Sequence, residues 1–210
     1  MDPAGRTLGQ LAKCGDVESV RRKIRWEGNS PNDPEERCDG HSPLFIAASA
    51  GDVPLCAALL EPQALASVEW KHHVTGSSAL LAAALGRHDE AIGLLLRHGA
   101  NACETNNLGL SPLVASAMKG SPACVHLLLQ AGEEAGLDMQ AQAEAAVTAA
   151  AKNGHADTIA VLRRQQLLLC QQRLAFAKGV GLLPYDVLVA ACAKLRVPTY
   201  AFAVQSLAAA

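Results

Sequence analysis

This chain of 210 residues has few aromatic residues: Phe, Trp and Tyr make up only 3% of it. A core must therefore be built from Ala, Leu and Val, which favours closely packed helices over sheets. Hydrophobic residues reach 50%, enough to bury a sizeable core in one large domain or two small ones. The composition indicates an all-α protein.

An excess of charge is also missing. Lys and Arg number 18 against 20 Asp and Glu, so no basic surplus is available to hold a polyanion by counterion release. No run approaches the roughly 18 uninterrupted apolar residues of a membrane span, and residues 1–15 lack the basic start and apolar stretch of a signal peptide. We therefore expect a soluble protein that binds neither nucleic acid nor membrane.

The cysteines show no pairing pattern. They are odd in number, widely spaced and without a Cys-x-x-Cys motif, which argues against both a disulfide framework and a zinc ribbon. We expect a reducing compartment, the cytoplasm or the nucleus. The seven residues are Cys14, Cys38, Cys56, Cys103, Cys124, Cys170 and Cys192.

Comparison of the sequence with itself shows a repeat. Residues 42–52 and 111–121 share one pattern of small, apolar and turn residues, and residues 78–88 and 145–155 are looser copies. A degraded fifth copy covers residues 6–16, so successive copies start 36, 36, 33 and 34 residues apart. A period of this length is typical of a solenoid built from repeated helix pairs.

Each copy contains the signals of a short helix followed by a second one. Ser42 and Ser111 stand where a helix N-cap is needed, and Pro43 and Pro112 follow at the first helical position. Glycines that allow a left-handed backbone then end the first helix. Leucines at spacings of three and four predict the second helix. The glycines are Gly51, Gly120 and Gly154.

Residues 99–113 follow, without a gap, the loop and helix-start pattern of ankyrin repeats, and the whole chain resembles that family. The resemblance implies stacked antiparallel helix pairs with a hairpin finger protruding between repeats. The His of the family's Thr-Pro-Leu-His motif is replaced here, and so is its finger Asp, which predicts weaker hydrogen bonding within the fingers. The replacements are Phe45, Leu81, Val114 and Thr148 for the His, and Arg37, His73, Asn106 and Gln140 for the Asp.

We expect an N-terminal capping repeat with a long first finger at residues 1–40, and a divergent repeat with an extended outer helix at 143–180. A C-terminal capping helix pair is expected at 181–210. The three regular repeats between them are predicted at residues 41–76, 77–109 and 110–142.

No catalytic motif is present, so we expect no enzyme activity and no cofactor. His72 and His73 are the only suggestive metal ligands, but neighbouring side chains in an extended finger point to opposite sides, so no metal site is expected. The basic run at residues 21–25 is interpreted as a solvated helix face around Val20 and Ile24, rather than a nuclear-import signal or an anion site.

Family resemblance implies that a partner protein binds on a concave groove formed by the fingers and the inner helices. A cluster of exposed apolar residues there would mark the contact, with Trp70 either as an aromatic anchor or folded back on its own repeat. The candidate residues are Asp39, His41, Trp70, His72, Val74, Leu85, Asn107, Leu108, Leu110, Met118, Lys119, Lys152 and Asn153.

The sequence thus predicts a monomeric, non-catalytic protein-interaction module that acts as an adaptor, a scaffold or an inhibitor. The alternative is that these repeats are the targeting or substrate-recognition part of a larger enzyme or enzyme complex. Nothing in the residues identifies the partner, because groove residues vary independently of the framework.

Overall fold

The computed structural model describes residues 5–64, 66–137 and 139–166. Contacts divide the chain into two units, Met1–Ile159 and Ala160–Ala210. The first unit contains the repeats considered below, and the described residues of the second, 160–166, are helical. The remainder of the expected long outer helix and the helix pair expected at 181–210 lie outside the described residues.

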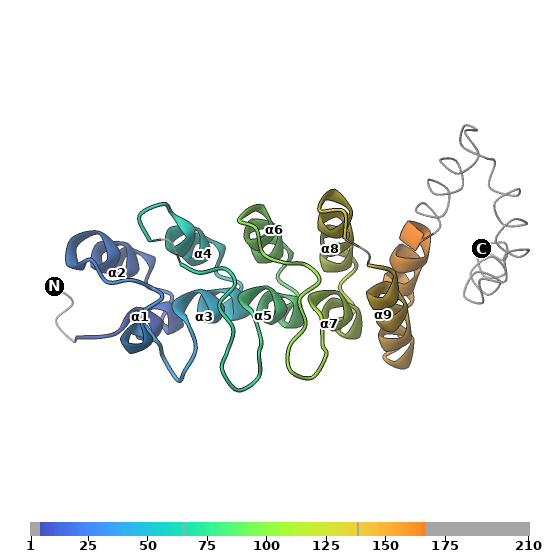
Figure 1. Ribbon diagram of the computed structural model, residues 1–210, viewed down its shortest axis with the longest axis horizontal. Helices are drawn as coiled ribbons and strands as arrows, with labels where there is room; N and C mark the ends of the chain where they lie inside the picture. Colours follow the sequence, from blue (N-terminus) through green and yellow to red (C-terminus); the bar gives the residue numbers. More distant parts are fainter. Residues whose placement is uncertain (1–4, 65, 138, 167–210) are drawn as a thin grey trace, which may run out of the picture. The chain divides into compact units, whose positions relative to one another are not determined.

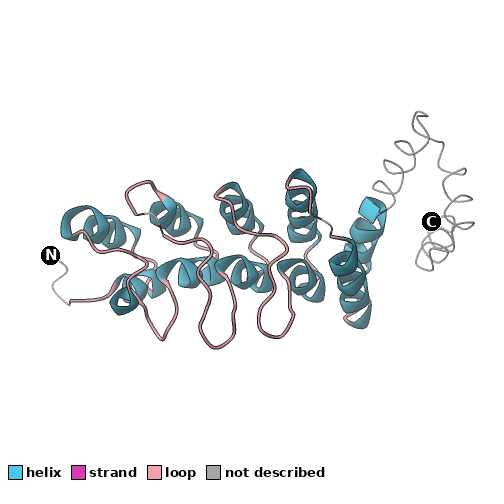
Figure 2. Ribbon diagram, in the orientation of Figure 1, coloured by secondary structure: helices cyan, strands magenta, loops and turns pink. Residues whose placement is uncertain are grey.

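Helices and loops make up the described part of the chain, which contains no β-strand, as the composition predicts (Figure 2). A π-helical turn, η1 (Lys23–Glu27), directly follows the second helix, and a 3₁₀ turn, η2 (Pro34–Glu36), lies in the first finger. The labelled α-helices are α1 (Leu8–Lys13), α2 (Val17–Arg22), α3 (Pro43–Ala50), α4 (Val53–Leu60), α5 (Ala79–Gly86), α6 (Asp89–Arg97), α7 (Pro112–Lys119), α8 (Pro122–Glu134) and α9 (Gln140–Lys152). Residues 156–166 are helical as well, at the start of the outer helix expected in the fifth repeat.

Within the first unit the helices stand in two rows (Figure 1). The inner row consists of α1, α3, α5, α7 and α9, and each of these helices packs against the next one in the row. The outer row consists of α2, α4, α6 and α8, each packed on the inner helix that precedes it. Fully buried alanines line the inner row, and their small side chains allow the helices to approach closely.

The inner helices begin as the sequence predicts. The side chain of Ser42 accepts a hydrogen bond of 3.2 Å from the amide of Phe45, and Ser111 accepts one of 3.3 Å from Val114. Proline occupies the first helical position in both helices. These contacts satisfy amide groups that have no partner inside the helix, so the predicted N-caps are confirmed.

The ends of α3 and α7 follow the predicted glycine pattern, whereas α5 departs from it. Gly51 and Gly120 cap α3 and α7 in the left-handed conformation, with φ of 72° and 66°. In α5 the glycine comes one residue early, and Arg87 takes the left-handed conformation with φ of 64°. A side chain at Gly86 would lie 2.4 Å from the ring of His88, so the close approach of this ring explains why glycine stands there.

Three fingers connect the outer helices to the following inner helices, at residues 28–42, 61–78 and 98–111. In the first two, an isolated antiparallel bridge joins Cys38 to His41 and Lys71 to Ser78. In the third, the amide of Asn106 donates to the carbonyl of Leu110 at 3.1 Å. The described fingers are therefore loops closed by a few backbone hydrogen bonds.

A fourth finger, which the repeat pattern predicts around residues 140–142, is replaced by a helix. α9 begins at Gln140, so the expected boundary between residues 142 and 143 falls inside it. Its sequence contains strong helix formers and neither glycine nor proline, which explains why the helix starts early. Gln142, expected in the finger, instead donates from Nε2 to the carbonyl of Cys103 at 2.9 Å.

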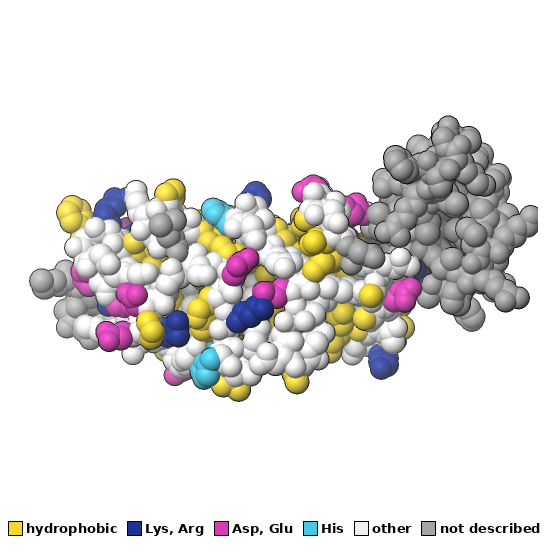
Figure 3. All heavy atoms as spheres, viewed as in Figure 1, with side chains coloured by type: hydrophobic (Ala, Val, Ile, Leu, Met, Phe, Trp, Pro, Cys, Tyr) yellow, Lys and Arg dark blue, Asp and Glu magenta, His cyan; other side chains and the backbone are white. Residues whose placement is uncertain are grey.

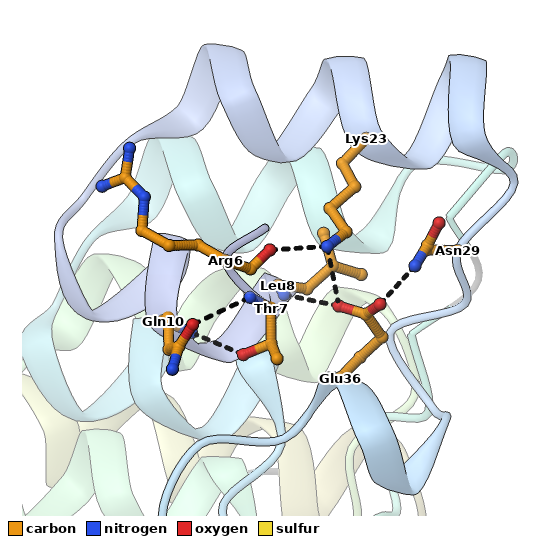
Figure 4. Close-up of polar contacts among 7 residues, drawn as sticks. All are labelled: Arg6, Thr7, Leu8, Gln10, Lys23, Asn29 and Glu36. Carbon is orange, nitrogen blue, oxygen red and sulfur yellow. Dashed lines mark hydrogen bonds and ion pairs between the residues drawn. The ribbon is translucent and has the colours of Figure 1, made fainter. Parts of the chain in front are cut away.

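A buried polar cluster fastens the first finger to the start of the chain (Figure 4). The carboxylate of Glu36 accepts hydrogen bonds from the amide of Leu8, at 2.6 Å, and from the side chain of Asn29. Lys23 Nζ lies 3.6 Å from the same carboxylate and donates to the carbonyl of Arg6 at 2.5 Å. The expectation that the whole basic run is solvated is thus wrong for Lys23, because the π turn directs this side chain inward.

Glu36→Ala should destabilise the protein strongly. The substitution leaves the buried Lys23 ammonium and the Leu8 amide without their partner, and breaking a buried ion pair on one side costs about 3 kcal/mol. Urea unfolding measures the loss, with Lys13→Ala as control, since Lys13 forms only an exposed ion pair with Asp39. Equal stability of both variants would contradict the assigned role of the cluster.

Arg87→Gly should stabilise the protein. A left-handed conformation costs a non-glycine residue about 1–2 kcal/mol, and the larger chain entropy of glycine takes back roughly 0.5–1 kcal/mol, so glycine should raise the free energy of unfolding by roughly 0.5–1 kcal/mol. The measurement is again urea unfolding. Arg97→Gly should instead destabilise the protein, because Arg97 is the last residue of α6 and has a helical conformation. A more stable Arg97→Gly variant, or a less stable Arg87→Gly variant, would refute the explanation.

Candidate partner-binding surface

The fingers and the C-terminal turns of the inner helices form one face of the first unit, here called the finger-side face. Four of the apolar residues predicted there are exposed: Val74 by 65%, Leu85 by 38%, Leu108 by 87% and Met118 by 40%. Figure 3 shows hydrophobic side chains at the tips of the second and third fingers. Large apolar side chains with this exposure on consecutive repeats are typical of a contact surface.

The second and third fingers are joined at their tips by Asn107. Its amide donates to the carbonyl of Thr75 at 3.0 Å, and its side-chain Nδ2 donates to the carbonyl of Val74 at 2.9 Å. An ion pair of 2.7 Å between Lys71 and Glu104 connects the same two fingers. Asn107, predicted as a contact residue, therefore holds the neighbouring finger in place.

Trp70 packs against Phe45 of its own repeat and against Arg37 of the preceding finger. Its ring meets Phe45 edge to face at a centroid distance of 6.1 Å, and the guanidinium of Arg37 lies 5.4 Å from the ring centroid. His41 stacks between Phe45 and His72, at centroid distances of 4.6 and 4.5 Å. Trp70, His41 and His72 are all half-buried in this aromatic cluster, so the folded-back arrangement is the one that the structure adopts.

The expectation that His72 and His73 point to opposite sides is wrong. Their ring centroids are 4.8 Å apart, because the chain turns here: the carbonyl of His72 accepts a hydrogen bond from the amide of Gly76 at 2.7 Å. Burial of the His72 ring, and then the neighbouring His41 and His73, lower the pKa of His72. The His72 ring is therefore neutral at neutral pH.

The remaining predicted residues differ in whether their side chains already contact other residues of the protein. Lys119 and Lys152 are exposed at the C-terminal ends of α7 and α9. Asp39 pairs with Lys13 at 3.0 Å, and the hydrogen bond from Lys13, followed by its charge, lowers the pKa of Asp39. Asn153 donates to the carbonyl of Ala149 at 2.8 Å, which makes it a helix-end residue.

Leu110 is half-buried at the base of the third finger. Its amide donates to the side-chain oxygen of Asn106 at 2.9 Å, and that oxygen also accepts from the amide of Leu108 at 3.0 Å. Asn106 thus shapes the loop from which the Leu108 side chain projects. Of the finger leucines, Leu108 is the more accessible to a partner.

Two histidines that the sequence analysis did not select connect their own repeat to the repeat before it. His88 Nε2 lies 3.2 Å from the carbonyl oxygen of Ser49, and His155 Nε2 lies 3.0 Å from that of Met118. In both cases the ring occupies the space left by a helix-ending glycine of that repeat, Gly51 or Gly120. The signal for this role was present in the sequence, since both histidines directly precede an outer helix.

Reactive chemistry is not evident among the described residues. The described cysteines form no disulfides, and burial raises the pKa of the Cys56 thiol to about 12, which makes it a poor nucleophile. Within residues 5–166 as described, no three or more His, Cys, Asp or Glu side chains are grouped to hold a metal ion. The described helices also include none with the length and hydropathy needed to cross a membrane.

Comparison with known proteins agrees with the fold. Residues 8–106 match the family model for ankyrin repeats, in three copies. Over 142 residues, 67% of the chain, the sequence is 30% identical to transient receptor potential cation channel subfamily A member 1 from Homo sapiens. The chain spans only 12% of the length of that channel subunit.

The family model covers the first three helix pairs, and the stacking of inner helices continues through α7 and α9. Ankyrin repeats are generally protein-interaction modules and typically non-catalytic. From its repeat pattern, its stacked helix pairs with fingers and these two matches, the chain is an ankyrin-repeat protein.

Proposed function

We propose that this protein is a non-catalytic interaction module, acting as an adaptor, scaffold or inhibitor, that binds another protein through its finger-side face. The observation that supports this most is the exposure of Leu108 and Val74, by 87% and 65%, at the tips of adjacent fingers. Such residues lose their contact with water only when a partner covers them, and this burial favours association.

Contacts between fingers support the same proposal. Asn107 bonds the two finger tips together, and the Lys71–Glu104 pair joins them lower down. A surface held in place before binding loses little conformational entropy on association. The binding mechanism we propose is therefore the docking of a partner on a preformed surface.

The charged residues around the apolar tips indicate how the partner is oriented. Lys119 and Lys152 are exposed on the same face, at the ends of α7 and α9. We propose that the partner places an apolar segment on the finger tips and acidic groups toward these lysines, which would contribute specificity and association rate more than affinity. Binding of one copy of this chain to one partner is part of the proposal.

The alternative, that the repeats serve as the targeting or substrate-recognition part of a larger enzyme, uses the same surface. One observation favours a role within a larger protein: the relative that resembles this chain is far longer, and the chain spans 12% of it. A transcript that continues into a catalytic domain would support the alternative. We place the protein in the cytoplasm or nucleus, a location with which the free cysteines agree.

Leu108→Glu and Val74→Glu should each abolish partner capture without changing the melting temperature. A carboxylate at an apolar contact must be desolvated on binding, so we expect at least about a tenfold loss of recovered partner. The measurement is affinity capture from a native lysate on the immobilised protein, followed by mass spectrometry.

The matched control is Leu137→Glu. Leu137 is also an exposed leucine, with 39% of its surface exposed, but it lies in the loop after α8 rather than in one of the three fingers. It should capture the same proteins as the unsubstituted chain. Capture that survives in both finger variants would rule out the finger tips as the binding surface.

A further inference from the structure

A second exposed surface lies on the outer row, at the first repeat. It is formed by α2, η1 and the residue that follows α4, and it surrounds a recess of about 620 Å³. Trp26 projects from it with 79% of its surface exposed. The residues of this outer patch are Glu18, Arg21, Arg22, Arg25, Trp26 and Glu61.

The position of Trp26 is a consequence of the π turn. Lys23 opens η1 and is drawn inward by the Arg6 carbonyl and the Glu36 carboxylate. The wider turn that follows places Arg25 and Trp26 in solvent before Gly28 ends the helix with φ of 69°. π turns within helices occur frequently at functional sites. The buried ion pair of Lys23 therefore fixes the turn from which Trp26 projects into solvent.

The arginines of the outer patch are unevenly neutralised. Arg21 lies 3.1 Å from Glu61 and 3.8 Å from Glu18, so both carboxylates of the patch are directed at this one guanidinium. Arg22 contacts the hydroxyl of Ser19 at 2.9 Å and also lies near the Asp16 carboxylate, whose pKa is lowered by hydrogen bonds from Ser19 and then by the charges of Arg6 and Arg22. Arg25 is exposed and forms no hydrogen bond or ion pair with the described residues. Positive charge thus remains available beside the indole ring.

We infer that this outer patch is a second binding surface, and that it takes an acidic peptide segment of another protein. An aliphatic or aromatic side chain of the segment rests on Trp26, and neighbouring carboxylates pair with Arg22 and Arg25. Guanidinium groups suit this role because their donors match the geometry of a carboxylate. The protein then contacts two partners at once, one on the fingers and one on the outer row.

A lipid surface fits the outer patch less well. A flat anionic bilayer would bring its negatively charged headgroups close to the carboxylates of Glu18 and Glu61, which would repel them. A peptide can instead direct its acidic groups to Arg22 and Arg25 alone. The recess beside Trp26 has room for a side chain. These features favour a peptide ligand.

The test is fluorescence anisotropy of a dye-labelled peptide in which Glu-Glu-Leu is repeated, titrated with the whole chain. We expect binding that weakens as salt is raised, since the contacts are exposed charge pairs. Trp26→Ser and Arg25→Glu should each lower the affinity by about tenfold or more. A peptide with lysine in place of glutamate should not bind.

Two variants serve as controls. Arg97→Glu changes an exposed arginine of another outer helix, and Leu108→Ser changes the most exposed large hydrophobic residue of the fingers. Both variants should bind the peptide like the unsubstituted chain. Loss of binding in Leu108→Ser alone would assign the peptide to the fingers, which overturns the inference but leaves the proposed function intact.

Three other results also overturn the inference. The first is an unchanged affinity of the Trp26→Ser variant for the peptide. The second is that the acidic peptide does not bind even at about millimolar protein, which would mean that the free energy of binding is weaker than about −4 kcal/mol. The third is Trp26-dependent binding to vesicles of equimolar phosphatidylcholine and phosphatidylserine when the peptide does not bind.

Discussion

Close packing between neighbouring inner helices is the interaction on which the rest of this structure depends. A pair of helices as short as α3 and α4, eight residues each, cannot bury an apolar face without a neighbour. The inner row solves this with alanine: Ala47, Ala83 and Ala117 have no exposed surface. Because these side chains are small, consecutive repeats approach closely enough for polar groups to bridge them.

Those bridges explain how a repeat framework positions a binding surface. His88 reaches the carbonyl of Ser49 across the space left by Gly51, and Asn107 reaches the backbone of the preceding finger. Each bridge joins one copy to the copy before it. The second and third fingers are thus held by bonds to each other as well as by their own internal hydrogen bonds, and this order is what the proposed docking of a partner requires.

The framework could be predicted from the sequence because its signals are local. The Ser42 cap, the proline after it and the glycine at the end of α3 each act within a few residues. The outward position of Leu108 could likewise be expected, since the repeat pattern places it at a finger tip.

Other features depended on contacts between distant segments, which the pattern does not encode. The inward turn of Lys23, and with it the exposure of Trp26, requires Glu36 from the first finger. Trp70 is half-buried because Arg37 and Phe45 lie against it. The missing fourth finger is a different case: helix propensity in residues 140–144 outweighed the repeat register, and the sequence alone could have shown it.

Backbone order parameters of the unbound protein, measured by NMR relaxation, test most directly whether neighbouring repeats order the fingers. The account predicts values of about 0.85 for residues 72–77 and 106–110, as in a rigid helix. Values below about 0.6 there, with ordered helices on either side, would show fingers that move independently and would contradict it.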